Sequence, residues 1–220
     1  MTNEQTVYND LLNSFSSTLH ETSKDDFGGT MIDCQMQVVC FDSFKDSISN
    51  GWNGRPKSCD ALYRYDADMW FLIEFKNGSI EFENKKSEDV DKKLFRPNAQ
   101  VFYGIIRKLF ESLFLLTDLL GQTIEFTRKN LIFILVYNEE KNKNLENSWY
   151  QVVKNHITML GHRNDILQMY NLSEILPDNP DNSDKSFNVS YFDKLYVKKA
   201  YVCSSRSFEE EFVKKYACES

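Results

Sequence analysis

The run NLIFILVYN at residues 130–138 constrains the fold more than any other stretch of the chain. Its apolar residues follow one another without alternation, and branched residues dominate. A strand of this kind is buried on both faces, which is typical of a central parallel position. Parallel neighbours need crossover connections that are usually helical, so the run predicts a sheet with helices on both of its faces.

The hydrophobic periodicity of the preceding residues predicts the rest of a compact core. The expected elements are a helix over 4–23, strands over 35–41, 59–65 and 69–76, a helix over 98–120 and the strand at 130–138. This order, αβββαβ, predicts an α/β fold built on a mixed sheet.

The remainder of the chain is expected to extend that core within a single domain of 220 residues. The core would span 4–138 and the extension 146–218. The extension would hold a helix over 146–170, one or two strands over 189–203 and a C-terminal helix. Ser207 and Glu210 have the spacing of a capping box that opens this last helix.

The stretch FLIEFKNG at 71–78 raises a question of chemistry, because it places two charges in an apolar strand. Residues two apart share a face of a strand, so Glu74 and Lys76 point the same way. With Asp66-Ala67-Asp68 as a three-residue hairpin loop, Asp60 pairs directly with Glu74. Opposed carboxylates repel each other across a sheet, and a divalent cation between them removes that repulsion. The alternative is that this face is simply solvated.

Asp60 followed by Glu74-Phe75-Lys76 resembles the motif of the PD-(D/E)XK nuclease superfamily, and the αβββαβ order is similar to its restriction-endonuclease-like core. Cys59 stands where the motif has proline. The resemblance implies Mg²⁺- or Mn²⁺-dependent cleavage of phosphodiester bonds, usually in DNA. Asp60 and Glu74 would hold the metal, and Lys76 would assist the attacking water.

The helix over 98–120 carries a polar stripe that contains Gln100 and Arg107, with Tyr103 beside it. Gln100-Val-Phe-Tyr103 is similar to the Q-x-x-Y element of recombination-type members of the superfamily. That resemblance implies contacts from Gln100, Tyr103 and Arg107 to the substrate backbone. The alternative is that the stripe is the wet side of the helix. Lys108 could be a further basic contact or a surface lysine.

Two further expectations concern side chains around this site. A third metal-binding carboxylate could come from the first helix, with Glu21 as the candidate and Glu4 as its alternative, although both could equally be surface residues. Trp70 lies opposite Arg64 in the expected hairpin, which predicts a cation–π pair beside the site.

Composition bears on the compartment and the partners. The N-terminus lacks the basic and apolar regions of a signal peptide, and the five cysteines form no CxxC pair, so we expect a reduced, cytoplasmic protein without a membrane segment. The net charge of −7 means that nucleic-acid binding requires a local basic patch.

Two classes of function follow. The first is a nuclease acting in restriction, repair, mobile elements or phage defence. The second is a catalytically idle protein-binding module on the nuclease fold, such as an immunity or accessory subunit, whose acidic surface would suit a basic partner.

Overall fold

The structure is a computed structural model that describes residues 3–25, 27–51, 54–78, 99–142 and 192–217. Within these ranges the strands form one six-stranded mixed sheet in the order β1-β2-β3-β4-β5-β6. Its first four strands are successively antiparallel, and β4, β5 and β6 are parallel. The strands are β1 (Ser16–Thr18), β2 (Gln37–Cys40), β3 (Ala61–Arg64), β4 (Trp70–Lys76), β5 (Leu131–Tyr137) and β6 (Lys199–Ser204).

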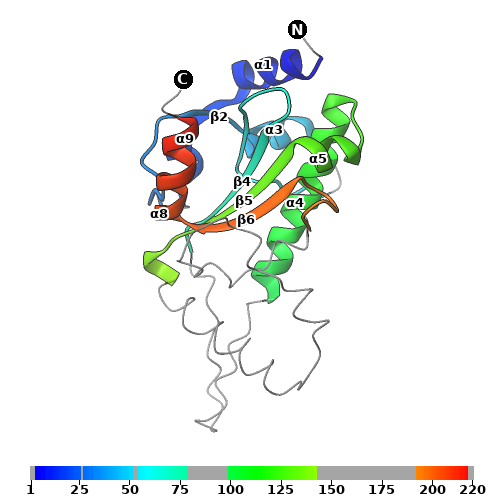
Figure 1. Ribbon diagram of the computed structural model, residues 1–220. Coiled ribbons are helices and arrows are strands. Elements are labelled where there is room, and N and C mark those ends of the chain that lie inside the picture. Colours follow the sequence, from blue (N-terminus) through cyan, green and yellow to red (C-terminus); the bar gives the residue numbers. More distant parts are fainter. Residues whose placement is uncertain (1–2, 26, 52–53, 79–98, 143–191, 218–220) are drawn as a thin grey trace, which may run out of the picture.

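Helices cover both faces of this sheet (Figure 1). One face carries α1 (Asn3–Phe15), α3 (Phe41–Ile48), α4 (Ala99–Leu120) and α5 (Ile124–Asn130). The other face is packed by α2 (Leu19–Thr22) and by the C-terminal helix, which runs through α8 (Ser205–Ser207), the π-helical turn η4 (Phe208–Val213) and α9 (Lys214–Tyr216). A 3₁₀ turn, η1 (Glu140–Asn142), follows β5.

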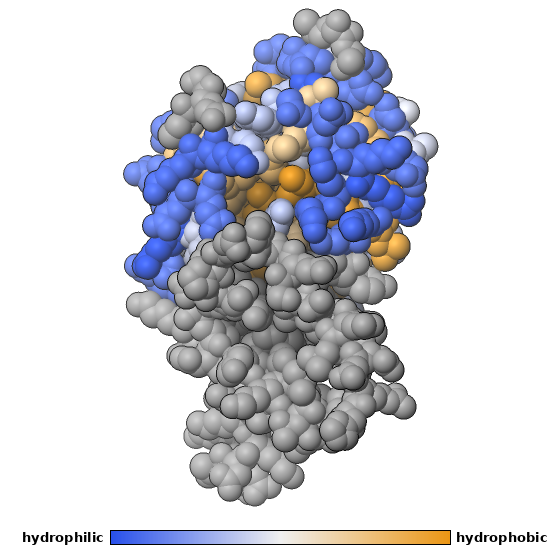
Figure 2. Space-filling model, in the orientation of Figure 1, coloured by the Kyte–Doolittle hydropathy of each residue, from blue (hydrophilic) through white to orange (hydrophobic). Residues whose placement is uncertain are grey.

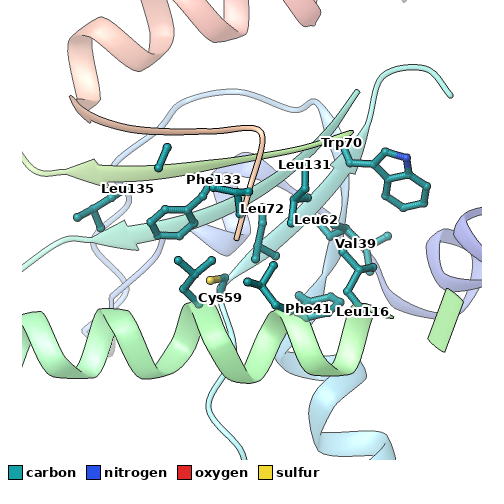
Figure 3. Packing of buried hydrophobic residues seen from close by; sticks show 14 of the residues in the cluster. Val39, Phe41, Cys59, Leu62, Trp70, Leu72, Leu116, Leu131, Phe133 and Leu135 are labelled. Atoms are coloured by element: carbon teal, nitrogen blue, oxygen red, sulfur yellow. The ribbon is translucent and has the colours of Figure 1, made fainter. Parts of the chain in front are cut away.

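The central position of β5 is confirmed, since it pairs in parallel with β4 on one side and β6 on the other. Alternate residues of β5 enter different cores. Leu131, Phe133 and Leu135 face α4, whereas Ile134 and Val136 face the C-terminal helix. Figure 3 shows the first of these cores, in which apolar side chains fill the space between α4 and the strands. The unbroken apolar run therefore reflects burial on two faces.

The hairpin of β3 and β4 has the predicted register. Arg64 pairs with Trp70 and Ala61 with Ile73, and the N–H of Tyr65 donates to the carbonyl of Met69. Arg64 Cζ lies 5.4 Å from the centroid of the Trp70 ring, which confirms the cation–π pair. Trp70 is about 13 Å from Glu74 along the strand, so the cation–π pair lies away from Glu74 and Lys76.

The single helix predicted over 4–23 is wrong in its middle. The chain leaves α1 at Phe15, forms the edge strand β1 and enters α2 at Leu19. Serine and threonine compete with helical hydrogen bonds through their own side chains, and Ser16-Ser17-Thr18 uses this property. The Ser16 hydroxyl donates to Gln37 at 2.6 Å, and Thr18 caps α2 by accepting from the N–H of Glu21.

Three smaller differences concern helices. The sequence did not predict α3 or α5, although Thr123 caps α5 by accepting from the N–H of Glu125. The C-terminal helix begins one turn earlier than predicted, because Ser204 and not Ser207 is its N-cap. The helix predicted over 146–170 lies outside the described residues, as do most residues of the 146–218 extension.

The surface of the described residues in Figure 2 is hydrophilic on its flanks, and hydrophobic residues gather between them, where β5 and β6 lie in Figure 1. Among the described helices, none combines the length and the apolar character needed to cross a bilayer.

Leu109 tests the packing of α4 on the sheet, because its side chain is fully buried in the core facing that helix. Leu109→Ala should lower the free energy of unfolding by about 2–5 kcal/mol, since the substitution leaves a cavity. Phe114→Ala removes a larger side chain from the same helix at a site that is 74% exposed, and should change stability by less than about 0.5 kcal/mol. Urea denaturation of both variants measures the difference, and equal losses would contradict the placement of α4.

Candidate active site

The candidate site lies where β3 begins and β4 ends, on the face of the sheet that α4 covers. Asp60 directly precedes β3, and its N–H donates to the carbonyl of Ile73 at 3.0 Å. The ladder of β3 and β4 ends where Ala61 pairs with Ile73, and the Asp60 bond departs from that register by one residue, so the predicted direct pairing of Asp60 with Glu74 is not part of the ladder. Asp60 and Glu74 nevertheless lie on the same side of the sheet, because both contact Lys108 of α4. Asp60 is also fixed by the N–H of Phe75, which donates to its Oδ2 at 2.6 Å.

Glu74 is the most unusual residue of the site, because its side chain is 0% exposed. It shares its face with Leu72, which belongs to the core under α4. The alternative of a solvated face is therefore wrong for Glu74. A carboxylate in such surroundings needs cationic or hydrogen-bonding partners, since an isolated buried charge is very costly.

Two lysines supply those partners. Lys76 Nζ lies 2.6 Å from Glu74 Oε1, which agrees with the predicted shared face. Lys108 Nζ, which comes from α4, donates to Glu74 Oε2 at 2.9 Å and to Asp60 Oδ1 at 3.2 Å. The two carboxylates therefore share one ammonium group and lie on either side of a single cation position.

Burial and mutual repulsion shift the protonation of this cluster. Removal from water, followed by the charge of Glu74, raises the pKa of Asp60 to about 7, although Lys108 and the Phe75 N–H oppose the change. Burial acts to lower the pKa of Lys108, but attraction to Glu74 and Asp60 outweighs it and raises that pKa. Lys108 is therefore a permanent cation, whereas Asp60 can take up a proton near neutral pH.

A basic cleft opens beside this cluster. Its volume is about 470 Å³, and it is lined by Lys57, Lys76, Gly78, Val101, Gly104, Arg107 and Lys108. Four of these seven residues are cationic, in a chain whose net charge is −7. The cleft therefore gathers cationic side chains in a chain that is acidic as a whole, and Lys76, Lys108 and Arg107 among them pair with carboxylates.

The predicted substrate-binding residues of α4 have different outcomes. Arg107 lines the cleft, and its Nε donates to Glu111 Oε1 at 2.6 Å. Glu111 Oε2 also accepts from the N–H of Lys57, so one carboxylate fixes both rims of the cleft. Tyr103 is 69% exposed and is not among the lining residues. The side chain of Gln100 lies outside the described residues.

The predicted third carboxylate does not join the site. Glu21 is exposed, and its Oε1 accepts from Lys24 at 2.6 Å, which lowers the pKa of Glu21. Glu4 accepts a hydrogen bond from Gln122 at 2.7 Å. Among the residues that the structure describes, no group of three acidic, histidine or cysteine side chains could hold a metal.

Asp60 and Glu74 nevertheless fit Mg²⁺, which keeps several waters and often takes only one or two carboxylates. The chemistry of the donors supports the fit, because the buried Glu74 Oε1 already binds cationic groups, with Lys76 Nζ at 2.6 Å and Lys108 Nζ at 2.9 Å. The Lys108 ammonium lies between the same two carboxylates and competes for that position.

The sequence left Lys108 open between a further basic contact and a surface lysine, and the structure places it at the carboxylates. The N–H of Cys59 donates to the buried Ser112 Oγ at 2.8 Å, and this bond ties the start of β3 to α4. Lys108 lies one turn before Ser112 and one turn after the buried Ile105, so all three share a helix face. A lysine on the apolar face of a helix was the available signal, since it has to find an anionic partner there.

Comparisons with protein-family models, curated proteins and solved structures find no match to the chain. The interpretation of the site therefore depends on its geometry and on the resemblance of its motif.

Asp60 should give the metal-free protein a distinctive pH dependence. Its raised folded pKa means that the folded state holds a proton that the unfolded state releases above about pH 4. The contribution of Asp60 to the free energy of unfolding is therefore complete below about pH 4, and it is lost as the pH rises through about 7. In chelator, the melting temperature of the parent should fall further between pH 5 and pH 8 than the melting temperature of Asp60→Asn. Identical pH profiles of the two proteins would contradict the assignment.

Proposed function

We propose that the chain is a metal-dependent nuclease that cleaves phosphodiester bonds of nucleic acid, with DNA as the expected substrate. The observation that carries the proposal is the pair Asp60 and Glu74, which share the Lys108 ammonium, with Glu74 fully buried and Lys76 beside it. Two carboxylates and a lysine converge at the edge of a basic cleft, which is an arrangement suited to holding a cation next to a phosphate.

The fold supports the proposal through the order of its elements. Taken without the short β1, α2, α3 and α5, the series α1, β2, β3, β4, α4 and β5 has the αβββαβ order of the PD-(D/E)XK core. The three antiparallel strands and the parallel β5 give the mixed sheet that the resemblance implies.

Asp60 and Glu74 would hold Mg²⁺ or Mn²⁺. Such a cation, when bound, polarises a phosphoryl oxygen and lowers the pKa of a coordinated water. Everything else is done by the chain's own residues. The Phe75 N–H keeps Asp60 turned toward Glu74, and the core under α4 excludes water from the Glu74 side.

Lys76 is suited to acting on the reacting phosphate because its side chain is 24% exposed and lines the cleft. Its ammonium can hold the attacking water in line or neutralise charge that develops on the phosphate oxygens. Lys57 and Arg107 line the same cleft and can take a neighbouring phosphate of the strand. Roles for Gln100 and Tyr103 in substrate binding stay predictions.

One observation favours the second candidate function, a catalytically idle protein-binding module. Lys76 and Lys108 already neutralise the charges of Asp60 and Glu74, so the two carboxylates are compensated without a metal ion. On this alternative the four residues are a structural charge network, and the acidic chain binds a basic protein partner.

Glu74→Gln and Lys76→Met together separate the two functions. Glu74→Gln should lose cleavage by at least about a hundredfold, because loss of a direct metal ligand should exceed the 10–100-fold cost of losing an outer partner. It should also lose the rise in melting temperature that Mn²⁺ produces in the parent. Lys76→Met should lose cleavage but keep that rise, since it removes a positive charge and no ligand.

The assay uses single-stranded and duplex DNA and RNA, in chelator, Mg²⁺ and Mn²⁺, with circular dichroism as the control for folding. If the parent cleaves none of these substrates and neither metal changes its melting temperature, the nuclease proposal is wrong and the binding-module function is the better one.

A further inference from the structure

The ammonium of Lys108 lies at the position that a divalent cation would take. Its Nζ is 3.2 Å from Asp60 Oδ1 and 2.9 Å from both oxygens of Glu74. In the described part of the chain it is the side chain that forms an ion pair with both carboxylates, whereas Lys76 pairs with Glu74 alone.

The charges of the cluster balance without a metal. Asp60 and Glu74 carry two negative charges when ionised, and Lys76 and Lys108 carry two positive charges. A divalent cation entering between the carboxylates would meet the Lys108 ammonium at a separation of a few ångströms. Like charges at this distance, in a site largely removed from water, repel strongly, so the cation and the ammonium cannot share the position.

The cleft offers a second position for the Lys108 ammonium. The side chain of Lys108 is 20% exposed and lines the basic cleft, so the ammonium can leave the carboxylates without movement of α4. A lysine carries its charge on a flexible four-carbon stem, which allows this displacement by rotation of side-chain bonds. The Ser112 bond to Cys59 would hold the helix in place meanwhile.

We propose that Lys108 is an internal counter-ion of the metal site, which occupies the cation position in the metal-free protein and moves into the cleft when a divalent cation binds. The inference rests on the proposed function. In the cleft, the displaced ammonium joins Lys57, Lys76 and Arg107 and contacts a phosphate of the substrate. Metal binding thereby adds a positive charge to the cleft, which couples affinity for the cation to affinity for the strand.

Lys108→Met tests the exchange by binding of Mn²⁺ alone. In chelator the variant should melt below the parent, because Asp60 and Glu74 lose their shared cation. Its affinity for Mn²⁺, measured by calorimetry, should be at least about tenfold higher than that of the parent, since no ammonium has to be displaced.

Lys45→Met is the matched control. Lys45 also lies between two carboxylates, at 3.2 Å from Asp42 and 3.1 Å from Asp46, and its side chain is 12% exposed. This variant should melt lower in chelator but keep the parent's affinity for Mn²⁺. Should Lys108→Met fail to fold in chelator, Lys108→Gln retains a donor for Glu74 and is measured in the same way. Failure of both to fold even in Mn²⁺ contradicts the exchange.

The outcomes distinguish this inference from the proposed function. Equal or weaker Mn²⁺ binding by Lys108→Met overturns the exchange and leaves the nuclease intact. Absence of Mn²⁺ binding in the parent and in every variant overturns both.

A second arm tests the phosphate contact with a phosphorothioate oligonucleotide that resists cleavage. Mn²⁺ should strengthen its binding to the parent, and Lys108→Met should lose most of that gain, whereas an equal gain in both proteins contradicts the contact.

Discussion

A glutamate buried on a central strand is the constraint around which the rest of the site is arranged. Glu74 lies on β4, between β3 and the parallel strand β5, and no part of its side chain reaches water. Burying one carboxylate beside another is unfavourable unless cations compensate for both. Lys76 and Lys108 compensate here, and each also lines the basic cleft. Because Lys108 reaches both carboxylates from α4, the charged cluster and the cleft meet where α4 packs on the sheet.

The same arrangement explains how an acidic chain can present a basic site. The cations of the cleft come from the loop before β3, the end of β4 and α4. Glu111 fixes two of the contributing segments by accepting from Arg107 and from the N–H of Lys57. Local potential in a cleft depends on nearby charges more than on the total, so the net charge of −7 does not preclude a polyanionic ligand.

The sequence was sufficient for features that depend on periodicity and parity. The apolar run of β5 predicted its central position, and the odd hairpin loop predicted the register of β3 on β4 and the shared side of Asp60 and Glu74. It was insufficient where a tertiary contact decides the outcome. Pairing with β2 converts Ser16-Ser17-Thr18 from helix to strand, and the depth of α4 on the sheet brings Lys108 to the carboxylates. The sequence also left the charged face of β4 open between a metal site and a solvated surface, and only the packing under α4 shows that Glu74 is buried.

Crystals of the parent protein grown with Mn²⁺ and measured for anomalous scattering would test the central claim most directly. We expect one anomalous peak bonded to both Asp60 and Glu74 at about 2.1–2.2 Å, close to the distance that Mg²⁺ takes. In that structure Lys108 Nζ should have left both carboxylates and should lie in the cleft. A structure without a peak at this site, in which Lys108 still joins Asp60 to Glu74, would contradict the claim.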